Sequence, residues 1–81
     1  MRIKLTVEES NLLDKLTARC KMNVAVSKDG DYAVDFDEHK KMSIKTLLDY
    51  VESNVAATKA MFSKEDVASF YKTYDKYILR R

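Results

Sequence analysis

Apolar and charged side chains alternate over residues 1–5, where three apolar residues are separated by Arg2 and Lys4. A period of two is typical of a β-strand that buries one of its faces. We therefore expect a short strand at residues 1–5. The period changes immediately after it, which indicates that a different element begins.

A helix is predicted next, because Thr6 and Glu9 have the spacing of a capping box. In that motif each side chain satisfies a free backbone N–H group at the helix start. The residues that follow place apolar side chains on one stripe at the helical period. These residues are Leu12, Leu13, Leu16 and Cys20. We expect the helix to reach about Lys21.

The single glycine, Gly30, lies in a run of alternating apolar residues at 22–36 that predicts a β-hairpin. A two-residue turn would place Val26 opposite Ala33 and mix apolar with polar residues on each face. A three-residue turn with Gly30 in the left-handed conformation instead pairs Val26 with Tyr32. We prefer this second register, because it gathers the large apolar residues on one face. That face would consist of Met22, Val24, Val26, Tyr32, Val34 and Phe36, and the opposite face of Asn23, Ala25, Ser27, Asp31, Ala33 and Asp35.

The second half of the chain predicts two helices, each with a serine at its start. Ser43 is placed to cap the first of them. Its buried stripe would consist of Ile44, Leu47, Leu48, Val51 and Val55. Ser63 and Asp66 have the spacing of another capped start. The last helix presents on one side Val67, Phe70, Tyr71, Tyr74 and Ile78.

These elements predict a two-layer α+β fold in the order β-α-β-β-α-α, with the helices packed on one face of a small three-stranded sheet. A right-handed crossover through the first helix would place the first strand beside the third. The chain has 81 residues, of which 46% are hydrophobic and 35% charged, which is enough for one core. We therefore treat residues 1–81 as a single domain.

Charge and cysteine content narrow the class of protein. Fifteen Lys and Arg against thirteen Asp and Glu give a formal net charge of +2, far from the profile of a dedicated nucleic-acid binder. A single cysteine cannot form an internal disulfide, and no apolar run approaches the about 20 residues that cross a bilayer. We expect a cytoplasmic protein without membrane contact.

Candidates for metal binding and catalysis are weak. Acidic residues cluster in and after the hairpin, at Asp29, Asp31, Asp35, Asp37 and Glu38. Their spacing does not match a calcium-binding EF-hand loop. His39 is the only histidine and Cys20 the only cysteine, too few ligands for a zinc site. Because Cys20 also continues an apolar stripe, we expect it to be structural, and we expect no metal, no cofactor and no catalytic residues.

A row of cations marks the last helix. Lys72, Lys76 and Arg80 recur every four residues opposite the aromatic side, and Arg81 follows them. We call Lys72, Lys76 and Arg80 the basic ridge. One interpretation is a solvated face. The other is a binding surface for an acidic partner, either a protein patch or the phosphates of a nucleic acid.

A second candidate surface lies on the flank of the preceding helix. Tyr50 falls off its buried stripe, with Ala57 and Met61 on the same side, and Tyr77 lies at the edge of the aromatic face of the last helix. Tyr and Met are enriched in protein interfaces. The flank either packs on the last helix or faces a partner. Any homodimer is expected to use this flank or the aromatic C-terminal helix.

The function most consistent with these features is a small non-catalytic protein-binding module. Its partner-binding residues would be Lys72, Lys76, Arg80, Arg81, Tyr50, Met61 and Tyr77. The small size suggests a regulator or inhibitor of a larger cytoplasmic machine, of the kind that phages and mobile elements encode. The alternative is a nucleic-acid-binding accessory protein that uses the basic ridge.

Overall fold

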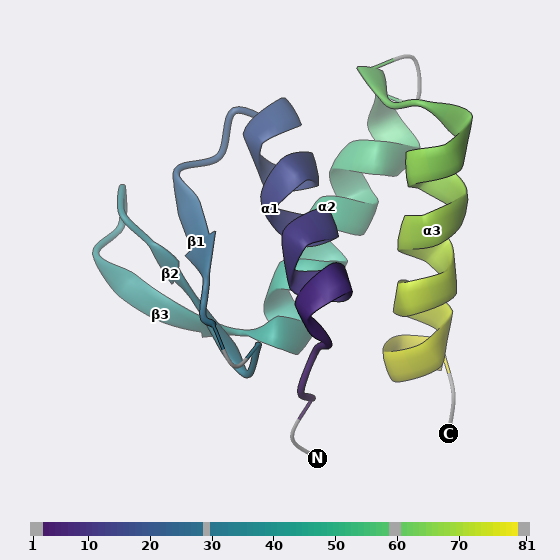
Figure 1. Cartoon of the computed structure of the whole chain (residues 1–81). Coiled ribbons are helices and arrows are strands. Elements are labelled where there is room, and N and C mark those ends of the chain that lie inside the picture. Colours follow the sequence, from purple (N-terminus) through teal and green to yellow (C-terminus); the bar gives the residue numbers. More distant parts are fainter. Residues whose placement is uncertain (1–2, 29, 59–60, 80–81) are drawn as a thin grey trace.

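The computed structural model describes residues 3–28, 30–58 and 61–79 (Figure 1). Its elements are α1 (Val7–Arg19), β1 (Val24–Val26), β2 (Tyr32–Asp35), β3 (Lys40–Ser43), α2 (Ile44–Ala57), α3 (Lys64–Tyr74) and a closing π-helical turn, η2 (Asp75–Leu79). The strands form one antiparallel sheet in the order β1-β2-β3. α1 and α2 lie on one face of it, and α3 packs against them on the side away from the strands (Figure 1). The predicted α+β class, with helices on one face of a three-stranded sheet, is confirmed.

The three helices begin at the predicted caps. Thr6 Oγ1 accepts a hydrogen bond from the N–H of Glu9 at 3.1 Å, and Glu9 Oε1 accepts one from the N–H of Thr6 at 2.9 Å. Ser43 and Ser63 cap α2 and α3 by accepting from the N–H groups three residues later. Within the described residues, none of these helices has the length and apolar content needed to cross a membrane.

The third strand lies at a different place in the chain from the predicted one. Residues 3–5 form no strand, although Leu5 is buried and its N–H donates to the carbonyl oxygen of Gly30 at 3.1 Å. The third strand is instead β3, which pairs with β2 after a short turn. In that turn Asp35 Oδ1 accepts hydrogen bonds from the N–H groups two and three residues later, so a polar segment reverses the chain. The order of elements differs from the expected one only in this strand.

The hairpin of β1 and β2 does not have the register expected from its apolar pattern. Val26 pairs with Ala33, not with Tyr32. Gly30 has the predicted left-handed conformation, with a φ of 71°, but the N–H of Ser27 donates to the carbonyl oxygen of Tyr32, so the loop is longer than three residues. Ala33 is fully buried as a result. A small side chain at the centre of the inner face lets the helices approach the sheet closely, which accounts for this register.

The two faces of the sheet therefore differ from the predicted ones. Residues that point towards the helices include Val24, Val26, Ala33 and Met42. The opposite side, which we call the outer sheet face, carries Ala25, Tyr32, Val34, Phe36 and Lys41, together with the polar residues Asn23, Ser27 and Ser43. Phe36 follows β2 and continues its register, because its N–H donates to the carbonyl oxygen of Asn23 at 2.9 Å. The expected outer face was correct for β1 and the residues beside it, where Asn23, Ala25 and Ser27 lie outside, and wrong for β2, where Tyr32 and Val34 replace Ala33 and Asp35.

One hydrophobic core fills the space between the sheet and the helices. Its fully buried side chains include Leu13, Leu16, Ile44, Leu47, Leu48, Val51, Val55 and Phe70. Phe70 lies edge-on to Tyr71, with ring centroids 5.4 Å apart. The hydroxyl of Tyr71 donates to Glu52 at 2.9 Å, and that of Tyr74 donates to Asp49 at 3.1 Å. The aromatic face of α3 is thus held on α2 both by apolar packing and by hydrogen bonds.

Candidate partner-binding site

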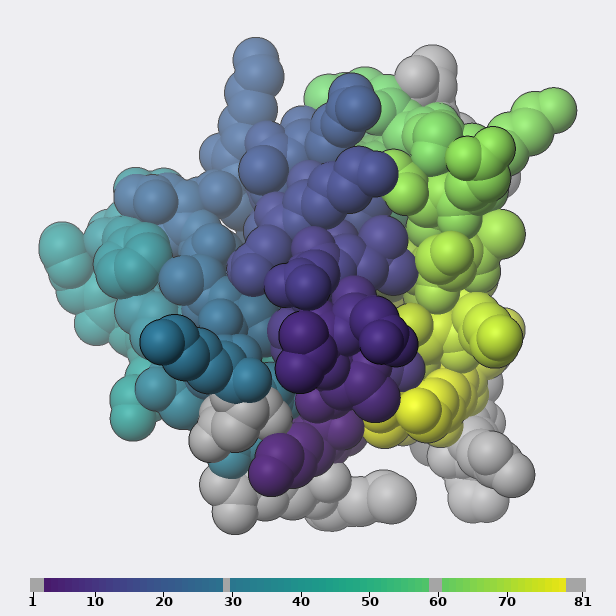
Figure 2. All heavy atoms as spheres, in the orientation of Figure 1, coloured from purple at the N-terminus to yellow at the C-terminus, as the bar shows by residue number. Residues whose placement is uncertain are grey.

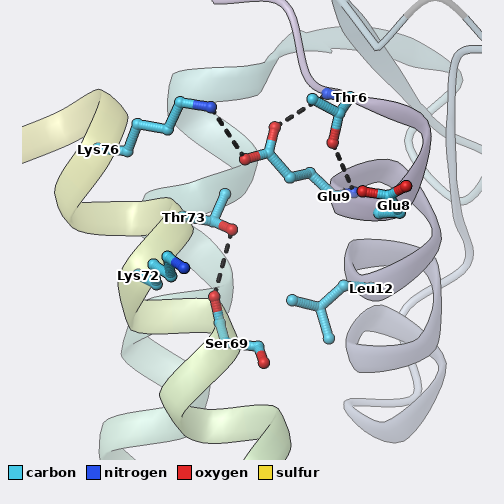
Figure 3. Close-up of a pocket in the computed structure, with 8 residues that line it drawn as sticks. All are labelled: Thr6, Glu8, Glu9, Leu12, Ser69, Lys72, Thr73 and Lys76. Carbon is cyan, nitrogen blue, oxygen red and sulfur yellow. Dashed lines mark hydrogen bonds and ion pairs between the residues drawn. The ribbon is translucent and has the colours of Figure 1, made fainter.

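A groove of about 460 Å³ lies between the start of α1 and the second half of α3. Thr6, Glu8, Glu9 and Leu12 line it from the α1 side, and Ser69, Lys72, Thr73 and Lys76 line it from the α3 side (Figure 3). Two of the cations of the basic ridge, Lys72 and Lys76, therefore belong to a concave surface that also includes a different helix. Figure 2 shows the purple start of the chain lying against its yellow C-terminal turn.

Interactions at both ends of the α1–α3 contact hold the two walls together. At one end, Lys15 Nζ lies 3.0 Å from Asp66 Oδ2, and this hydrogen-bonded ammonium holds the pKa of Asp66 below its usual range. At the other end, Lys76 Nζ lies 3.4 Å from Glu9 Oε2. Because each wall is a helix fixed by packing and by these pairs, we expect the groove to exist before a partner binds.

Glu9 is the most heavily engaged side chain of the groove. Its Oε1 accepts hydrogen bonds from the hydroxyl of Tyr77 at 2.8 Å and from the N–H of Thr6 at 2.9 Å. Burial opposes its ionisation, but these two hydrogen bonds and the ammonium of Lys76 outweigh it and hold the pKa of Glu9 below its usual value. Burial and the bond to Glu9 conversely raise the pKa of Tyr77. Glu9 is thus an ionised structural group, and it already satisfies Lys76.

Lys72 has a different environment from Lys76, although both lie on the same ridge. It is exposed, and among the described residues it has neither an ion pair nor a hydrogen-bonded partner. Leu12 points from α1 across the groove towards Ser69 and Thr73 of α3 and gives the groove an apolar floor (Figure 3). A groove that holds both an ammonium group and an aliphatic side chain is suited to a ligand that combines a carboxylate with an apolar portion.

The charge of the groove is mixed rather than basic. Glu8 and Glu9 occupy the first turn of α1, where carboxylates interact favourably with the helix dipole, and they line the groove opposite Lys72 of α3 and Lys76 of η2. Each carboxylate of the α1 rim would add a like charge beside any phosphate that bound in the groove.

The structure does not bring all the predicted site residues together. Tyr50 is 53% exposed and lines a separate hollow of about 230 Å³, together with Cys20 and residues at the start of β1 and at the end of β2. Met61, 43% exposed, lies in the connection between α2 and α3. Tyr77 lies at the end of the α1–α3 groove, with its hydroxyl on Glu9 rather than towards a partner. Arg80 and Arg81 lie outside the described residues.

The α1 wall of the groove could not be recognised from local sequence signals. Thr6 and Glu9 are visible in the sequence as a helix cap and Leu12 as part of an apolar stripe, and both readings are correct. Nothing in the local pattern indicates that these residues face Lys72 and Lys76. The row of cations in the sequence indicated the α3 wall of the groove. It did not indicate that α1 forms the other wall.

The residues considered earlier for chemistry have ordinary surroundings. Cys20 caps the end of α1 and is half-buried, and burial raises the pKa of its thiol, which keeps it protonated. His39 is exposed in the turn before β3 and has a left-handed φ of 56°. In the part of the chain that the structure describes, His, Cys, Asp and Glu residues form no group of three placed to hold a metal ion.

Comparison with known proteins adds no relative. No protein-family model matches the chain, and neither a curated protein nor a solved structure matches it. The function is therefore argued from the geometry and charge of the surfaces themselves.

Proposed function

We propose that this chain is a small, non-catalytic protein-binding module and that the groove between α1 and α3 receives a segment of its partner. The observation that supports this proposal is Lys72, an exposed ammonium in the groove whose apolar floor is Leu12, without an ion-pair partner among the described residues. The segment that fits carries an acidic side chain for Lys72 and an apolar side chain for the floor. Burying both kinds of group in one groove gives affinity and orientation together.

The charges of the groove favour a protein over a nucleic acid. Of the two described cations of the basic ridge, Lys76 is already paired with Glu9, and Glu8 lies on the opposite rim. Affinity for nucleic acids depends on several cations that neutralise phosphates without carboxylates between them. Nucleic-acid binding therefore remains the alternative, and it depends on Arg80 and Arg81 contributing to the ridge.

We also propose a wider role for this module, as a regulator or inhibitor of a larger machine in the cytoplasm, encoded by a phage or another mobile element. The support is the single cysteine, which is consistent with a reducing compartment. The partner would then be a component of that machine with an acidic segment on its surface.

The proposal is tested by reversing one charge inside the groove and one outside it. Lys72→Glu places a carboxylate beside Leu12, whereas Lys64→Glu makes the same change at the first residue of α3, outside the groove. Partners are first captured with the wild-type protein, and the purified partner is then titrated against all three proteins. We expect Lys72→Glu to weaken binding about 3- to 10-fold and Lys64→Glu to leave it unchanged.

Equal affinity of the partner for wild type and Lys72→Glu would remove the groove from the proposal. A polarisation titration with labelled DNA and RNA tests the alternative. We expect no binding at low salt. Oligonucleotide binding that falls steeply with salt and is lost in Lys72→Glu would assign the ridge to phosphates instead.

A further inference from the structure

The outer sheet face is an apolar feature that the proposed function does not use. Tyr32, Val34 and Phe36 follow one another along β2, the central strand, and all point away from the helices. Tyr32 is 36% exposed and Phe36 is 49% exposed. None of the described helices covers this side of the sheet, and α3, which forms one wall of the groove, packs on α1 and α2 on the side away from the strands (Figure 1).

The charged residues of this face are few. It carries one cation, Lys41, and its other polar residues, Asn23, Ser27 and Ser43, are uncharged. The register turns the carboxylate of Asp35 to the other side. Lys41 Nζ lies 4.7 Å from the centre of the Tyr32 ring, so the cation covers the aromatic residue instead of standing free. The solvated face of an antiparallel sheet is normally polar. An apolar stripe on its central strand therefore indicates a contact surface.

We infer that this face stacks on the same face of a second copy of the chain, with the two-fold axis running along β2. Sheets that pack face to face lie about 10 Å apart with their strands within about 30° of each other. The stripe of each copy would then cover the stripe of the other. The inference is independent of the partner groove, because the two surfaces share no residue.

The side chains on the two outer strands, β1 and β3, support a second copy as the occupant. A two-fold axis along β2 places β1 of one copy over β3 of the other, so Lys41 lies opposite Ala25. The small Ala25 leaves room for the aliphatic stem of Lys41, and its ammonium can still reach water at the rim. The alternative two-fold axis, across the strands, would put Lys41 against Lys41. Charge and side-chain size together select the first arrangement.

The size of the face sets the strength of the dimer. Tyr32 and Phe36 are only partly exposed, and the other residues of the face offer less apolar area. The area buried on each copy is therefore below the roughly 800 Å² per partner of a standard interface. We therefore expect a reversible dimer with a dissociation constant of about 10 to 1000 µM. The amide of Asn23 donates to Asp37 at 3.2 Å, so a carboxylate lies at the end of the face beyond Phe36. Because the copies bring such carboxylates closer together, added salt should tighten the dimer.

Sedimentation or light scattering between about 10 µM and about 1 mM tests the inference. The variant is Phe36→Glu, and the matched control is Tyr50→Glu, which changes an aromatic residue of similar exposure on the helical side. We expect the mass of wild type and Tyr50→Glu to rise from 9.4 kDa with concentration, and that of Phe36→Glu to stay at 9.4 kDa. Strictly monomeric wild type, or a Phe36→Glu variant that associates as wild type does, overturns it. If Tyr50→Glu loses association and Phe36→Glu does not, the contact lies on α2 around Tyr50 and the inference is wrong.

A second measurement needs no variant and so does not depend on the folding of Phe36→Glu. Backbone amide resonances of the wild-type protein are followed by NMR over the same concentration range. We expect the shifts to move for Ala25, Val34 and Lys41, and to stay constant for Glu8 and Lys72 in the groove. Concentration-dependent shifts confined to α2 or α3 would overturn the inference.

Discussion

The hydroxyl of Tyr77 donates a 2.8 Å hydrogen bond to Oε1 of Glu9, a residue 68 positions earlier in the chain. This bond joins η2 to the first turn of α1, and Lys76 reinforces it from the same turn. The N-terminal cap of α1 thereby depends on the last described turn of the chain, because one carboxylate serves both. Glu9 closes the capping box of α1 with one oxygen and pairs with Lys76 through the other.

Stability should fall in acid through Glu9. The pKa of Glu9 is lower in the folded protein than the usual 4.5, so the ionised carboxylate stabilises the fold. This contribution is complete above pH 4.5 and is lost as the pH falls through the lowered folded-state pKa. We expect Glu9→Gln to cost about 1 kcal/mol at neutral pH. Urea unfolding of both proteins at a series of pH values measures the difference.

The pH dependence separates this charge effect from a simple change of side chain. The gap between wild type and Glu9→Gln should close once the pH is below the lowered pKa of Glu9. Tyr77→Phe should show part of the same behaviour, because it removes one of the hydrogen bonds that favour the ionised form. A gap of constant size at every pH would mean that Glu9 acts through packing rather than charge.

The tyrosines of α3 should contribute to stability through their hydroxyl groups. Tyr71 and Tyr74 donate to Glu52 and Asp49 on α2, whereas the hydroxyl of the exposed Tyr50 has no such bond among the described residues. We expect Tyr71→Phe and Tyr74→Phe each to lower the free energy of unfolding by about 0.5–1 kcal/mol. Tyr50→Phe, the control, should change it by less than about 0.5 kcal/mol. Chemical denaturation followed by circular dichroism gives all three values, and equal effects at the three positions would contradict the assignment.

Gly30 should not tolerate a side chain. Its φ of 71° is left-handed, and a Cβ there would lie 2.8 Å from the carbonyl oxygen of Leu5. Gly30→Ala therefore combines backbone strain with a clash against the segment that precedes α1. We expect a loss of about 1–3 kcal/mol, measured as a shift of the urea midpoint. Lys28→Ala in the same turn is the control and should be nearly neutral, and an equally neutral Gly30→Ala would disprove the close approach of Leu5.

Local signals in the sequence were sufficient for the helices but not for the sheet. A cap such as Thr6 with Glu9 involves residues three apart, so both the pattern and its consequence are local. β3 contains a single apolar residue, Met42, and forms because the preceding turn is closed by the Asp35 side chain. β3 forms because it pairs with β2. The pattern of apolar and polar residues within β3 does not indicate this pairing.

The candidate site was predictable only on one side for a related reason. The row of Lys72 and Lys76 follows from the helical period, so the α3 wall could be proposed from spacing alone. Spacing alone does not show that Lys76 forms an ion pair and that Lys72 does not. That difference depends on Glu9, which reaches Lys76 only once α1 and α3 have packed together. Long-range packing also decides that Tyr77 lies inside this contact and Tyr50 outside it.

From the register of β1 and β2 we expect opposite effects on stability when Ala33 and Val34 are enlarged. Ala33 is fully buried under the helices, whereas Val34 lies on the outer sheet face. Ala33→Leu adds three carbon atoms to a filled core and should cost about 1–3 kcal/mol. Val34→Leu adds one carbon atom at a partly solvated position and should change stability by less than about 0.5 kcal/mol. In the register that pairs Val26 with Tyr32 the order is reversed, since Val34 would then be inside. Urea unfolding of the two variants at a concentration below that of any dimer therefore decides between the registers, and a larger loss for Val34→Leu would refute the observed pairing.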